Sequence, residues 1–526
     1  MTTREPETEN VMMDYIIGID VGTTSTKALI YDTDGNIYGK ANKGYPLYQD
    51  TPDMAEEDPD EIFNATVSAM QEVVAKANIT DGKVIAISWS AQQHSLIALD
   101  KDFKPLTRSL TWADNRSQKY AAEYKQNGRG MEMYKRTGLP IHPMGPFYKL
   151  LYFKNERPEI FGQAAYWVGI KEYIIWKYTG VLKEEVSMAA ATGLLNMNSA
   201  QWDEEALKET GLTEKQLPEL VDTTDKFQGI KPEYAKVIGI DKDVYFVMGA
   251  TDGALSTIGV GAIQTGVLAI NIGTSAAVRT FVDKPRVDPK ARLYCYPVMK
   301  GKYLVGGPIN NGGIVLNWAH DSLFGGEVEA AKLLHIDSYD MLSKIAATVP
   351  AGSDGLIFHP YLGGERAPLW DANARGSFFG LNRKHTRAHM IRAVMEGIMY
   401  NLYSVTLALK EVTGEPKAVL AAGGFARSTL WTQMMADIFE HNIVIPESYE
   451  SGSLAAMFLA KMALGLEDNL EDIKKYMGKE TVYEPNEDVF KRYRTLMPIY
   501  LRLSRDLSKE YEGIAEYQRE FSDTDE

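Results

Sequence analysis

Two short segments, half a chain apart, carry residue types that can hold phosphate groups. The segment GIDVGTTST at 18–26 returns in similar form as AINIGTSAA at 269–277. In each copy an apolar run leads into a Gly-Thr turn, and a small polar side chain, Asp20 or Asn271, precedes the turn. Glycine lets the backbone approach a ligand closely, and the amide and threonine groups that follow can donate to phosphate oxygens. The matched pair indicates two similar domains that hold one phosphorylated ligand, a nucleotide, between them.

A second acidic side chain follows a later apolar run. Asp252 lies in GATDGALSTIGVG at 249–261, at the end of a predicted strand. A carboxylate in this position could accept the proton of a substrate hydroxyl, and partial desolvation would raise its basicity. The alternative is that Asp252 only caps a helix that begins at Gly253. Asp20 has similar alternatives: it could hold Mg²⁺ directly or through water, or it could only bond to turn amides.

Further residues near the two turns could meet a nucleotide. The first turn lacks the GKS/T ending of a Walker loop, yet Thr23, Thr24 and Lys27 are placed to approach phosphate oxygens. Gly423-Gly424 follows the apolar run AVLAA and precedes a predicted helix. This junction could seat a nucleotide, although in isolation a packed helix cap is the better explanation.

The elements that must position these residues alternate between strand and helix. Strands are predicted on both sides of the first turn and at 84–91, with a helix at 58–77 between them. The strand at 84–91 ends in the polar residues Gln92, Gln93 and His94, and open α/β sheets bind ligands at such strand ends. A mainly helical stretch is predicted from about 117 to 220. The alternation then returns in the second half, with predicted strands at 243–251, 268–280, 303–307 and 418–424 and helices at 388–412 and 429–440.

Composition limits the class of protein. The chain has 526 residues, which predicts two domains, and 45% of them are apolar. The formal charge of −15 argues against a nucleic-acid partner, and the single cysteine, Cys295, fits a reducing compartment such as the cytoplasm. The stretch 247–272 is apolar but interrupted by polar residues and glycines, so a membrane span is not expected. The polar start lacks the apolar core of a signal peptide.

Taken together, the motifs closely resemble the FGGY family of carbohydrate kinases, over about residues 15–500. GIDVGTTSTK resembles the family's first phosphate loop, GATDG its catalytic-aspartate segment, and NIGTSA its second phosphate loop. AAGGFARSTLWTQMMADIF resembles its adenosine-binding segment, and GSFFGLNRKHTRAHMIRAVME at 376–396 fits a family signature. A second signature is met at 144–156, except that Tyr152 stands where tryptophan is usual.

The resemblance implies an α/β fold of two duplicated actin/hexokinase-like (ribonuclease H-like) domains with an interdomain cleft. We expect an N-terminal domain at 14–257 with the sugar site, and a C-terminal domain at 258–512 with the ATP site. Residues 1–13 and 513–526 are expected to be disordered tails. Family members are often dimers, so a homodimer is a further expectation.

The resemblance also implies roles for single residues, with ATP and Mg²⁺ as cofactors. Asp252 is the general base, and Asp20 and Asp252 are the expected Mg²⁺ ligands. Gln93 and His94 are expected to contact the sugar, with Met144 on its other wall. The residues expected at ATP are Thr23, Thr24, Lys27, Gly273, Thr274, Gly313, Asn317, Gly424 and Ser428.

The substrate is the least determined point. SAQQHS differs from the Arg-Glu pair of glycerol kinases, and its histidine also fits xylulokinases. TWADNRS at 111–117 and GLPIHPMGPFYKL at 138–150 look most like the gluconate kinases of the family. D-gluconate is therefore the preferred substrate, with xylulose or another ketose as the alternative. The groups that could bind its carboxylate are Arg116, His94, His142 and Lys149.

Three alternatives to these expectations stay open. Arg116 could simply pair with Asp114, and Lys149 could be an ordinary helix residue. The chain could be a non-catalytic sugar sensor, although its first 13 residues are too few for a helix-turn-helix. It could also be an actin-like or chaperone ATPase, which would leave the sugar-site segments unexplained.

Overall fold

The computed structural model describes residues 13–79, 82–447 and 450–521, and these form two compact units. Unit 1 contains the chain up to Thr137, then His142–Gly259 and Glu450–Tyr476; unit 2 contains Gly138–Ile141, Val260–Tyr449 and the chain from Met477 onward. The division after Gly259 lies beside the boundary expected from the sequence. The return of Glu450–Tyr476 to unit 1 was not expected.

The predicted disordered C-terminal tail is wrong for residues 513–521, which form the end of helix α17 (Glu487–Phe521). The buried residues of α17 recur at helical spacing from Tyr493 as far as Ala515, so its packing extends beyond the predicted end of the domain. Residues 1–12 and 522–526 of the predicted tails lie outside the described residues, and Met13 begins the first strand.

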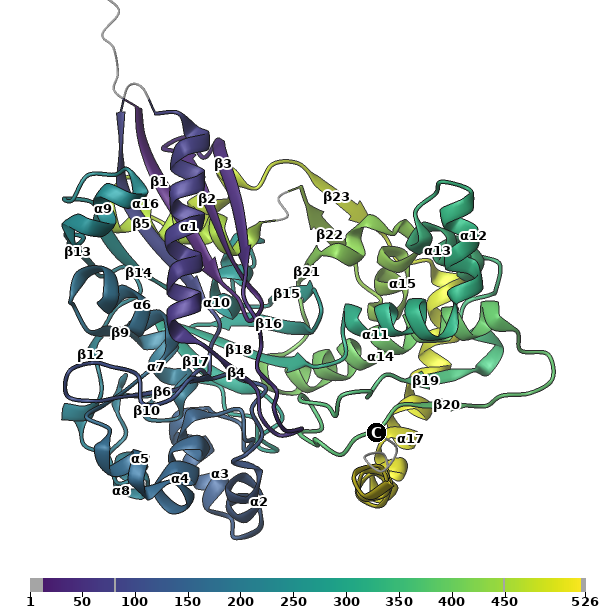
Figure 1. Ribbon diagram of the computed structural model, residues 1–526. Helices are drawn as coiled ribbons and strands as arrows, with labels where there is room; N and C mark the ends of the chain where they lie inside the picture. Colours follow the sequence, from purple (N-terminus) through teal and green to yellow (C-terminus); the bar gives the residue numbers. More distant parts are fainter. Residues whose placement is uncertain (1–12, 80–81, 448–449, 522–526) are drawn as a thin grey trace, which may run out of the picture. The chain divides into compact units, whose positions relative to one another are not determined.

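Unit 1 is built on a six-stranded sheet in the order β13-β14-β5-β1-β2-β3 (Figure 1). The strands β1, β5 and β14 run parallel, and the other neighbours pair antiparallel. Their bounds are β1 Met13–Val21, β2 Ser25–Asp32, β3 Ile37–Gly44, β5 Gly82–Ala91, β13 Lys226–Gln228 and β14 Tyr245–Thr251.

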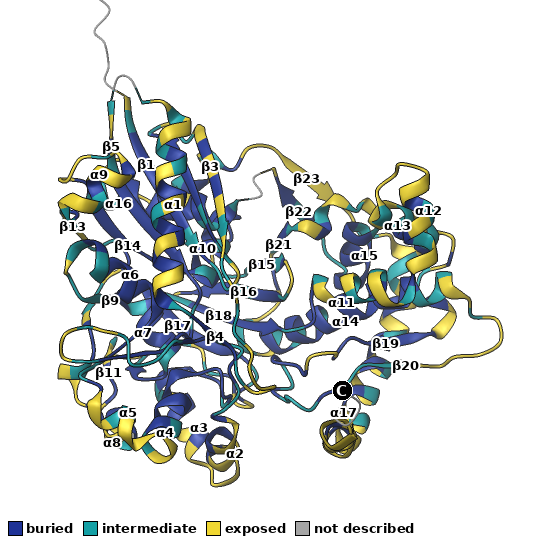
Figure 2. Ribbon diagram, viewed as in Figure 1, coloured by how far each residue is buried: buried dark blue, intermediate teal, exposed yellow. Residues whose placement is uncertain are grey.

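Helices cover both faces of this sheet. Since side chains alternate along a strand, Ile17 and Ile19 of β1 point to one face, where they join a core that includes residues of α1 (Pro59–Ala77). Gly18 faces the opposite way, toward α16 (Ser451–Leu464), and a Cβ on Gly18 would lie 2.3 Å from Ser453 O. The central strands β1 and β5 are consequently buried on both sides, as their dark blue colour in Figure 2 shows.

Between β5 and β14 the chain adds helices and short strands to unit 1. The stretch predicted to be mainly helical contains α2 to α8, but it also contains short strands that the sequence did not indicate. The helices that matter for the site are α3 (Arg129–Thr137), α4 (Pro146–Glu156), α6 (Ile170–Thr179), α7 (Val186–Thr192) and α8 (Glu204–Thr210).

Unit 2 repeats the sheet of unit 1 and adds one strand. Its order is β17-β18-β16-β15-β21-β22-β23. The neighbouring pairs from β18 to β23 have the same directions as those of unit 1 read from β3 to β13: two antiparallel pairs, two parallel pairs and one antiparallel pair. The predicted two-domain α/β fold is confirmed. The strand bounds are β15 Val267–Ile272, β16 Ala276–Val282, β17 Tyr294–Met299, β18 Lys302–Ile309, β21 Ala418–Gly423, β22 Ile443–Pro446 and β23 Glu480–Tyr483.

In unit 2, as in unit 1, helices lie between strands along the chain. Helices α14 (Arg387–Thr413) and α15 (Thr429–Phe439) confirm the two long helices predicted for the second half. Between β18 and α14 lie α11 (Gly313–Trp318), α12 (Gly325–Leu333) and α13 (Ser338–Ala347). No helix of the described residues is both long enough and apolar enough to cross a bilayer.

Candidate active site

The carboxyl ends of three parallel strands bring the two predicted aspartates of unit 1 to one edge of its sheet. Asp20 of β1 is in register with Ser90 of β5, and Ser90 is in register with Ala250 of β14. Asp252 follows β14 directly and is the first residue of α10 (Asp252–Gly259). The two carboxylates are near enough for Asp252 to raise the pKa of Asp20.

The Asp20 carboxylate is only partly exposed and has one neutral hydrogen-bond donor. Burial raises its pKa to about 6, a bond from Ser90 Oγ to Oδ1 of 2.7 Å opposes the shift, and the charge of Asp252 adds to it. On its other side a Cβ at Gly452 would lie 3.4 Å from Asp20 Oδ2. A carboxylate in this setting gains stability from a bound cation, so the residues fit a Mg²⁺ ion held by Asp20 with water completing its shell. No group of three or more His, Cys, Asp or Glu side chains suited to a metal occurs among the described residues, and Mg²⁺ does not need one.

Asp252 stands at the N-terminus of α10, one residue before the predicted helix start. Its Oδ1 accepts a hydrogen bond of 2.7 Å from Gly253 N, so the capping contact considered from the sequence is present. The preceding hydroxyl, Thr251 Oγ1, accepts from Ala254 N at 3.3 Å. A helix N-terminus stabilises a nearby negative charge, and the contact leaves the carboxylate at the strand end.

The first Gly-Thr turn connects the aspartate edge with the sugar-site residues. Gly22 N donates to Ser25 O at 3.0 Å and closes the turn. Thr23 Oγ1 donates to Gln92 Oε1 at 3.1 Å and accepts from Trp112 Nε1 at 2.9 Å. Thr24 is exposed, and Lys27 Nζ lies 3.5 Å from Glu450 Oε2.

The predicted sugar-site residues follow β5 and precede α4. Gln93 is partly buried, whereas His94 is buried and has a φ of 69°, an uncommon conformation for a residue other than glycine. His142 and Met144 are buried, and Met144 N donates to His142 Nδ1 at 3.2 Å. These residues supply imidazole and amide groups beside an apolar wall.

Arg116 and Lys149 have structural partners. Arg116 forms ion pairs with Asp114 and Glu56, so the pairing with Asp114 considered as an alternative is present. Lys149 is fully buried, and its Nζ donates to His94 O at 2.7 Å and to Thr111 O at 2.6 Å. Burial lowers the pKa of Lys149 to about 7. Both side chains therefore hold the backbone and acidic residues around the site.

Sequence reasoning missed a buried carboxylate next to this cluster. Glu57 accepts a hydrogen bond of 2.7 Å from Gln92 Nε2, and burial raises its pKa to about 8. Glu57 lies in the acidic segment EEDPDE, which looks like a solvated helix start, so no local pattern distinguishes it. Hydrogen bonds from Gln92 to Glu57 and from Thr23 to Gln92 thus link the end of β5 to the first Gly-Thr turn.

In unit 2 the second Gly-Thr turn packs against the start of α11. Gly313 N donates to Gly273 O at 2.8 Å, and Ile314 N donates to Thr274 O at 3.0 Å. A Cβ on Gly313 would lie 2.7 Å from Gly273 O, so only glycine fits there without a shift. Gly273 and Thr274 are themselves exposed at the end of β15.

The remaining predicted ATP residues lie at helix ends of the same unit. Asn317 Oδ1 accepts from the Tyr339 hydroxyl at 3.0 Å. Ser428 caps α15 by accepting from Trp431 N at 3.3 Å, and it lies 3.2 Å from Ser343 Oγ. A Cβ on Gly424 would meet open space, as expected for a surface that a ligand can approach.

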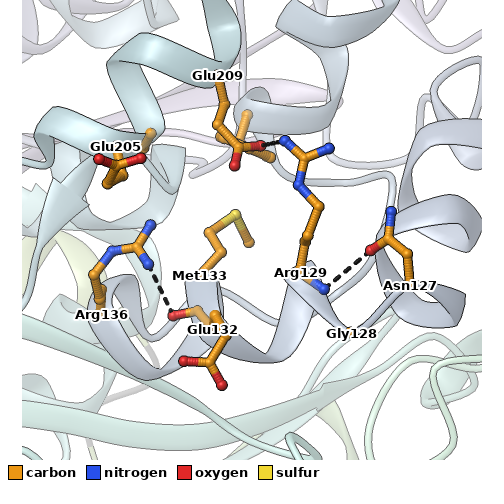
Figure 3. A pocket seen from close by; sticks show the side chains of 10 residues that line it. Asn127, Gly128, Arg129, Glu132, Met133, Arg136, Glu205 and Glu209 are labelled. Atoms are coloured by element: carbon orange, nitrogen blue, oxygen red, sulfur yellow. Dashed lines mark hydrogen bonds and ion pairs between the residues drawn. The ribbon is translucent and has the colours of Figure 1, made fainter.

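A separate cavity of about 330 Å³ lies in unit 1 between α3, α4 and α8 (Figure 3). None of the predicted site residues lines it. Charged side chains that face it have ion-pair partners, as in the pair of 2.6 Å between Arg129 and Glu209.

Two sheets of one topology, each with a Gly-Thr turn where its first strand ends, define a duplicated α/β fold with an aspartate pair on one unit. The chain belongs to the FGGY family of carbohydrate kinases: the family's N-terminal domain matches residues 15–259 and its C-terminal domain matches residues 268–464. The resemblance found in the sequence is confirmed.

Individual relatives cover nearly the whole chain. Gluconokinase of Bacillus subtilis is 49% identical over 97% of this chain and 99% of that protein. Xylulose kinase of Bacillus subtilis is 28% identical over 93% of this chain and 96% of that protein. Two solved structures from Lactobacillus acidophilus, one of gluconate kinase and one of ligand-bound xylulose kinase, each match with 47% identity and a TM-score of 0.90. Each comparison covers 95% of this chain and 100% of the other.

Proposed function

We propose that this chain transfers the γ-phosphate of ATP to the terminal hydroxyl of D-gluconate and produces 6-phospho-D-gluconate and ADP. The observation that carries the substrate is the identity to gluconokinase of 49%, against 28% to xylulose kinase, in comparisons that cover both chains almost completely. The solved structures match both substrate classes equally, so a ketose remains the alternative that the experiment must test.

In the proposed reaction Asp252 accepts the proton of the terminal hydroxyl while its oxygen attacks the γ-phosphorus. One P–O bond forms to the sugar acid, the bond to the β-phosphate oxygen breaks, and the electron pair leaves with ADP. Phosphoryl transfer has a loose transition state, so alignment and charge neutralisation contribute more than covalent chemistry. Asp252 supports this role because it stands at a strand end beside Asp20.

We assign the Mg²⁺ site to Asp20, with Asp252 as its neighbour. A bound Mg²⁺ would neutralise charge that develops on the phosphate oxygens. Asp20 supports this assignment because Ser90 orients one of its oxygens and Gly452 leaves room beside the other. Thr23, Thr24 and Lys27 would approach the transferred phosphate from the first turn.

For gluconate itself we assign the contacts to Gln93, His94, Met144 and His142. Arg116 and Lys149 are already bonded to carboxylates and carbonyls, so their part is to hold the walls of the site. ATP would bind unit 2 at Gly273, Thr274, Gly313, Asn317, Gly424 and Ser428. A cytoplasmic location and a homodimer remain predictions.

The test is ATP-dependent ADP release with D-gluconate, D- and L-xylulose, D- and L-ribulose, glycerol or no sugar. We expect strong stimulation by gluconate alone and its loss, by at least about 10³-fold, in Asp252→Asn, which is nearly isosteric. Stimulation by a ketose instead would refute the substrate but leave a kinase. Silence across the panel would favour a sugar sensor.

A further inference from the structure

A buried polar cluster lies next to the strand end that carries Asp252. Lys171 of α6 and Glu185, the residue before α7, are both fully buried, and Lys171 Nζ lies 2.7 Å from Glu185 Oε1. Glu185 also accepts from Ser187 N at 2.7 Å and from Met188 N at 3.1 Å. The carboxylate therefore both caps α7 and neutralises a buried lysine.

Ser187 connects this cluster to β14. Its Oγ donates to Glu185 Oε1 at 2.9 Å and accepts from Thr251 N at 3.0 Å. A hydroxyl has one hydrogen, and the Glu185 carboxylate bonded to Lys171 can only accept. The hydrogen must therefore point to Glu185, which leaves a lone pair directed at the N–H of Thr251, the residue before Asp252.

The bond from Ser187 adds to a strand end whose pairing is irregular just before it. The register between β14 and β5 shifts between Val247 and Ala250. Within this shift Gly249 has a φ of 67°, and a Cβ there would lie 1.9 Å from Trp89 O. The ladder resumes after this shift, where Ala250 pairs with Ser90 and Thr251 with Ala91, and Ser187 holds Thr251 in addition from the side of α7.

Two further buried carboxylates, Glu172 and Glu184, lie near Lys171 and Glu185. Burial raises the pKa of Glu172 to about 7 and holds that of Glu184 well above its usual value. A buried ion pair is costly to break, because the remaining partner is left charged without compensation. The hydrogen bond from Ser187 is therefore accepted by a buried carboxylate, Glu185, that Lys171 holds in place.

We propose that Ser187, fixed by Glu185 and Lys171, is a positioning residue that holds the backbone of Thr251 so that Asp252 meets the substrate hydroxyl. This inference rests on the proposed function of Asp252 as the general base. It extends that function because Ser187 is buried and acts through its hydrogen bond to the strand end.

The test compares Ser187→Ala with Ser187→Thr, which keeps a hydroxyl. We expect Ser187→Ala to lower kcat by roughly 10- to 100-fold, since a misplacement of about 1 Å can cost about 100-fold. The KM values for gluconate and ATP should stay within about twofold, and Ser187→Thr should restore most of kcat. If Ser187→Ala does not fold, the nearly isosteric Ser187→Cys takes its place.

The matched control is Thr107→Val, which removes another hydroxyl that accepts from a backbone N–H of unit 1, that of Ala98 at 3.1 Å. Thr107→Val should lower Tm about as much as Ser187→Ala does, and it should leave kcat unchanged. An equal kcat for Ser187→Ala and Thr107→Val would overturn the positioning role alone. Near-normal turnover by Asp252→Asn would instead overturn the assigned base, and the inference with it.

Discussion

At the scale of single residues, the site combines groups that chemistry requires with groups that hold them. Asp20 and Asp252 lie near each other, and the hydrogen bond to the Asp20 carboxylate comes from the neutral hydroxyl of Ser90. The basic side chains of Lys149 and Arg116 bond to backbone carbonyls and to carboxylates. From the sequence, both a carboxylate-binding role and a structural role were open for these two residues.

The raised pKa of Asp20 has a measurable effect on stability. Because its folded pKa of about 6 exceeds the ordinary value of 3.8, the folded protein without ligands binds this proton more tightly than the unfolded chain. That stabilisation is complete below the ordinary pKa and is lost as pH rises through about 6. Asp20→Asn cannot ionise, so it should be more stable than the wild type at pH 8, by at most about 3 kcal/mol. The difference should shrink at pH 5.

The measurement is Tm without Mg²⁺ or nucleotide at both pH values, with activity lost in Asp20→Asn throughout. The control is Asp34→Asn, which changes an exposed aspartate in the turn between β2 and β3 and should give no such pH-dependent gain. Equal Tm values for the wild type and Asp20→Asn at pH 8 would show that Asp20 is not destabilised by burial.

At the scale of elements, the second Gly-Thr turn depends on the start of α11. The two hydrogen bonds from Gly313 and Ile314 hold the turn by its carbonyl groups, and Gly273 N donates to Ser275 O within the turn. In the first turn the carbonyl groups of Gly22 and Thr24 accept from Tyr45 instead, and Thr23 donates to Gln92. The two copies are alike in sequence but are supported by different neighbours.

Gly313→Ala should therefore damage nucleotide binding. The new Cβ would lie 2.7 Å from Gly273 O, and the turn must shift to accept it. We expect the KM for ATP to rise by about 10-fold or more while gluconate binding, measured by calorimetry, is unchanged. The control is Gly326→Ala in α12, where a Cβ meets open space. An unchanged KM for ATP would exclude this turn from the nucleotide site.

Much of this arrangement was predictable, for physical reasons. Strands and turns such as GIDVGTT follow from apolar runs ending at glycine, and α14 and α15 follow from helical spacing. Lys149 was ambiguous because its partners are backbone carbonyls of His94 and Thr111, which no pattern of residue types reveals. Ser187 was missed for the same reason, since its importance comes from a single contact 64 residues along the chain.

At the scale of the whole molecule, unit 1 is completed by a helix from near the end of the chain. Helix α16 packs on β1, β5 and β14, and it contacts α10 closely: a Cβ on Gly259 would lie 2.0 Å from Ser451 O. The two consecutive domains predicted from the sequence placed α16 in the C-terminal domain. The apolar sequence of α16 does not indicate which sheet the helix packs on. Residues 450–476 thus belong structurally with the aspartate pair.

Gly18→Ala should reveal this coupling in the full chain. Its Cβ would lie 2.3 Å from Ser453 O, so α16 must move, at a cost of about 1–3 kcal/mol for overpacking. Hydrogen exchange at residues 451–464 should rise, far from residue 18 in sequence. Gly44→Ala is the control, since its Cβ would lie 3.7 Å from Thr24 O, an ordinary contact. Unchanged exchange at 451–464 would contradict the packing.

The return of α16 to unit 1 also determines when this protein can finish folding during its synthesis. The ribosome releases β1, β5 and β14 early, but the helix that covers one face of these strands is made only after most of unit 2. Until then that apolar face stays uncovered, and the aspartate edge lacks Gly452. A nascent chain stalled before residue 450 should therefore bind chaperones through its first half and show no kinase activity, however completely its early strands have paired.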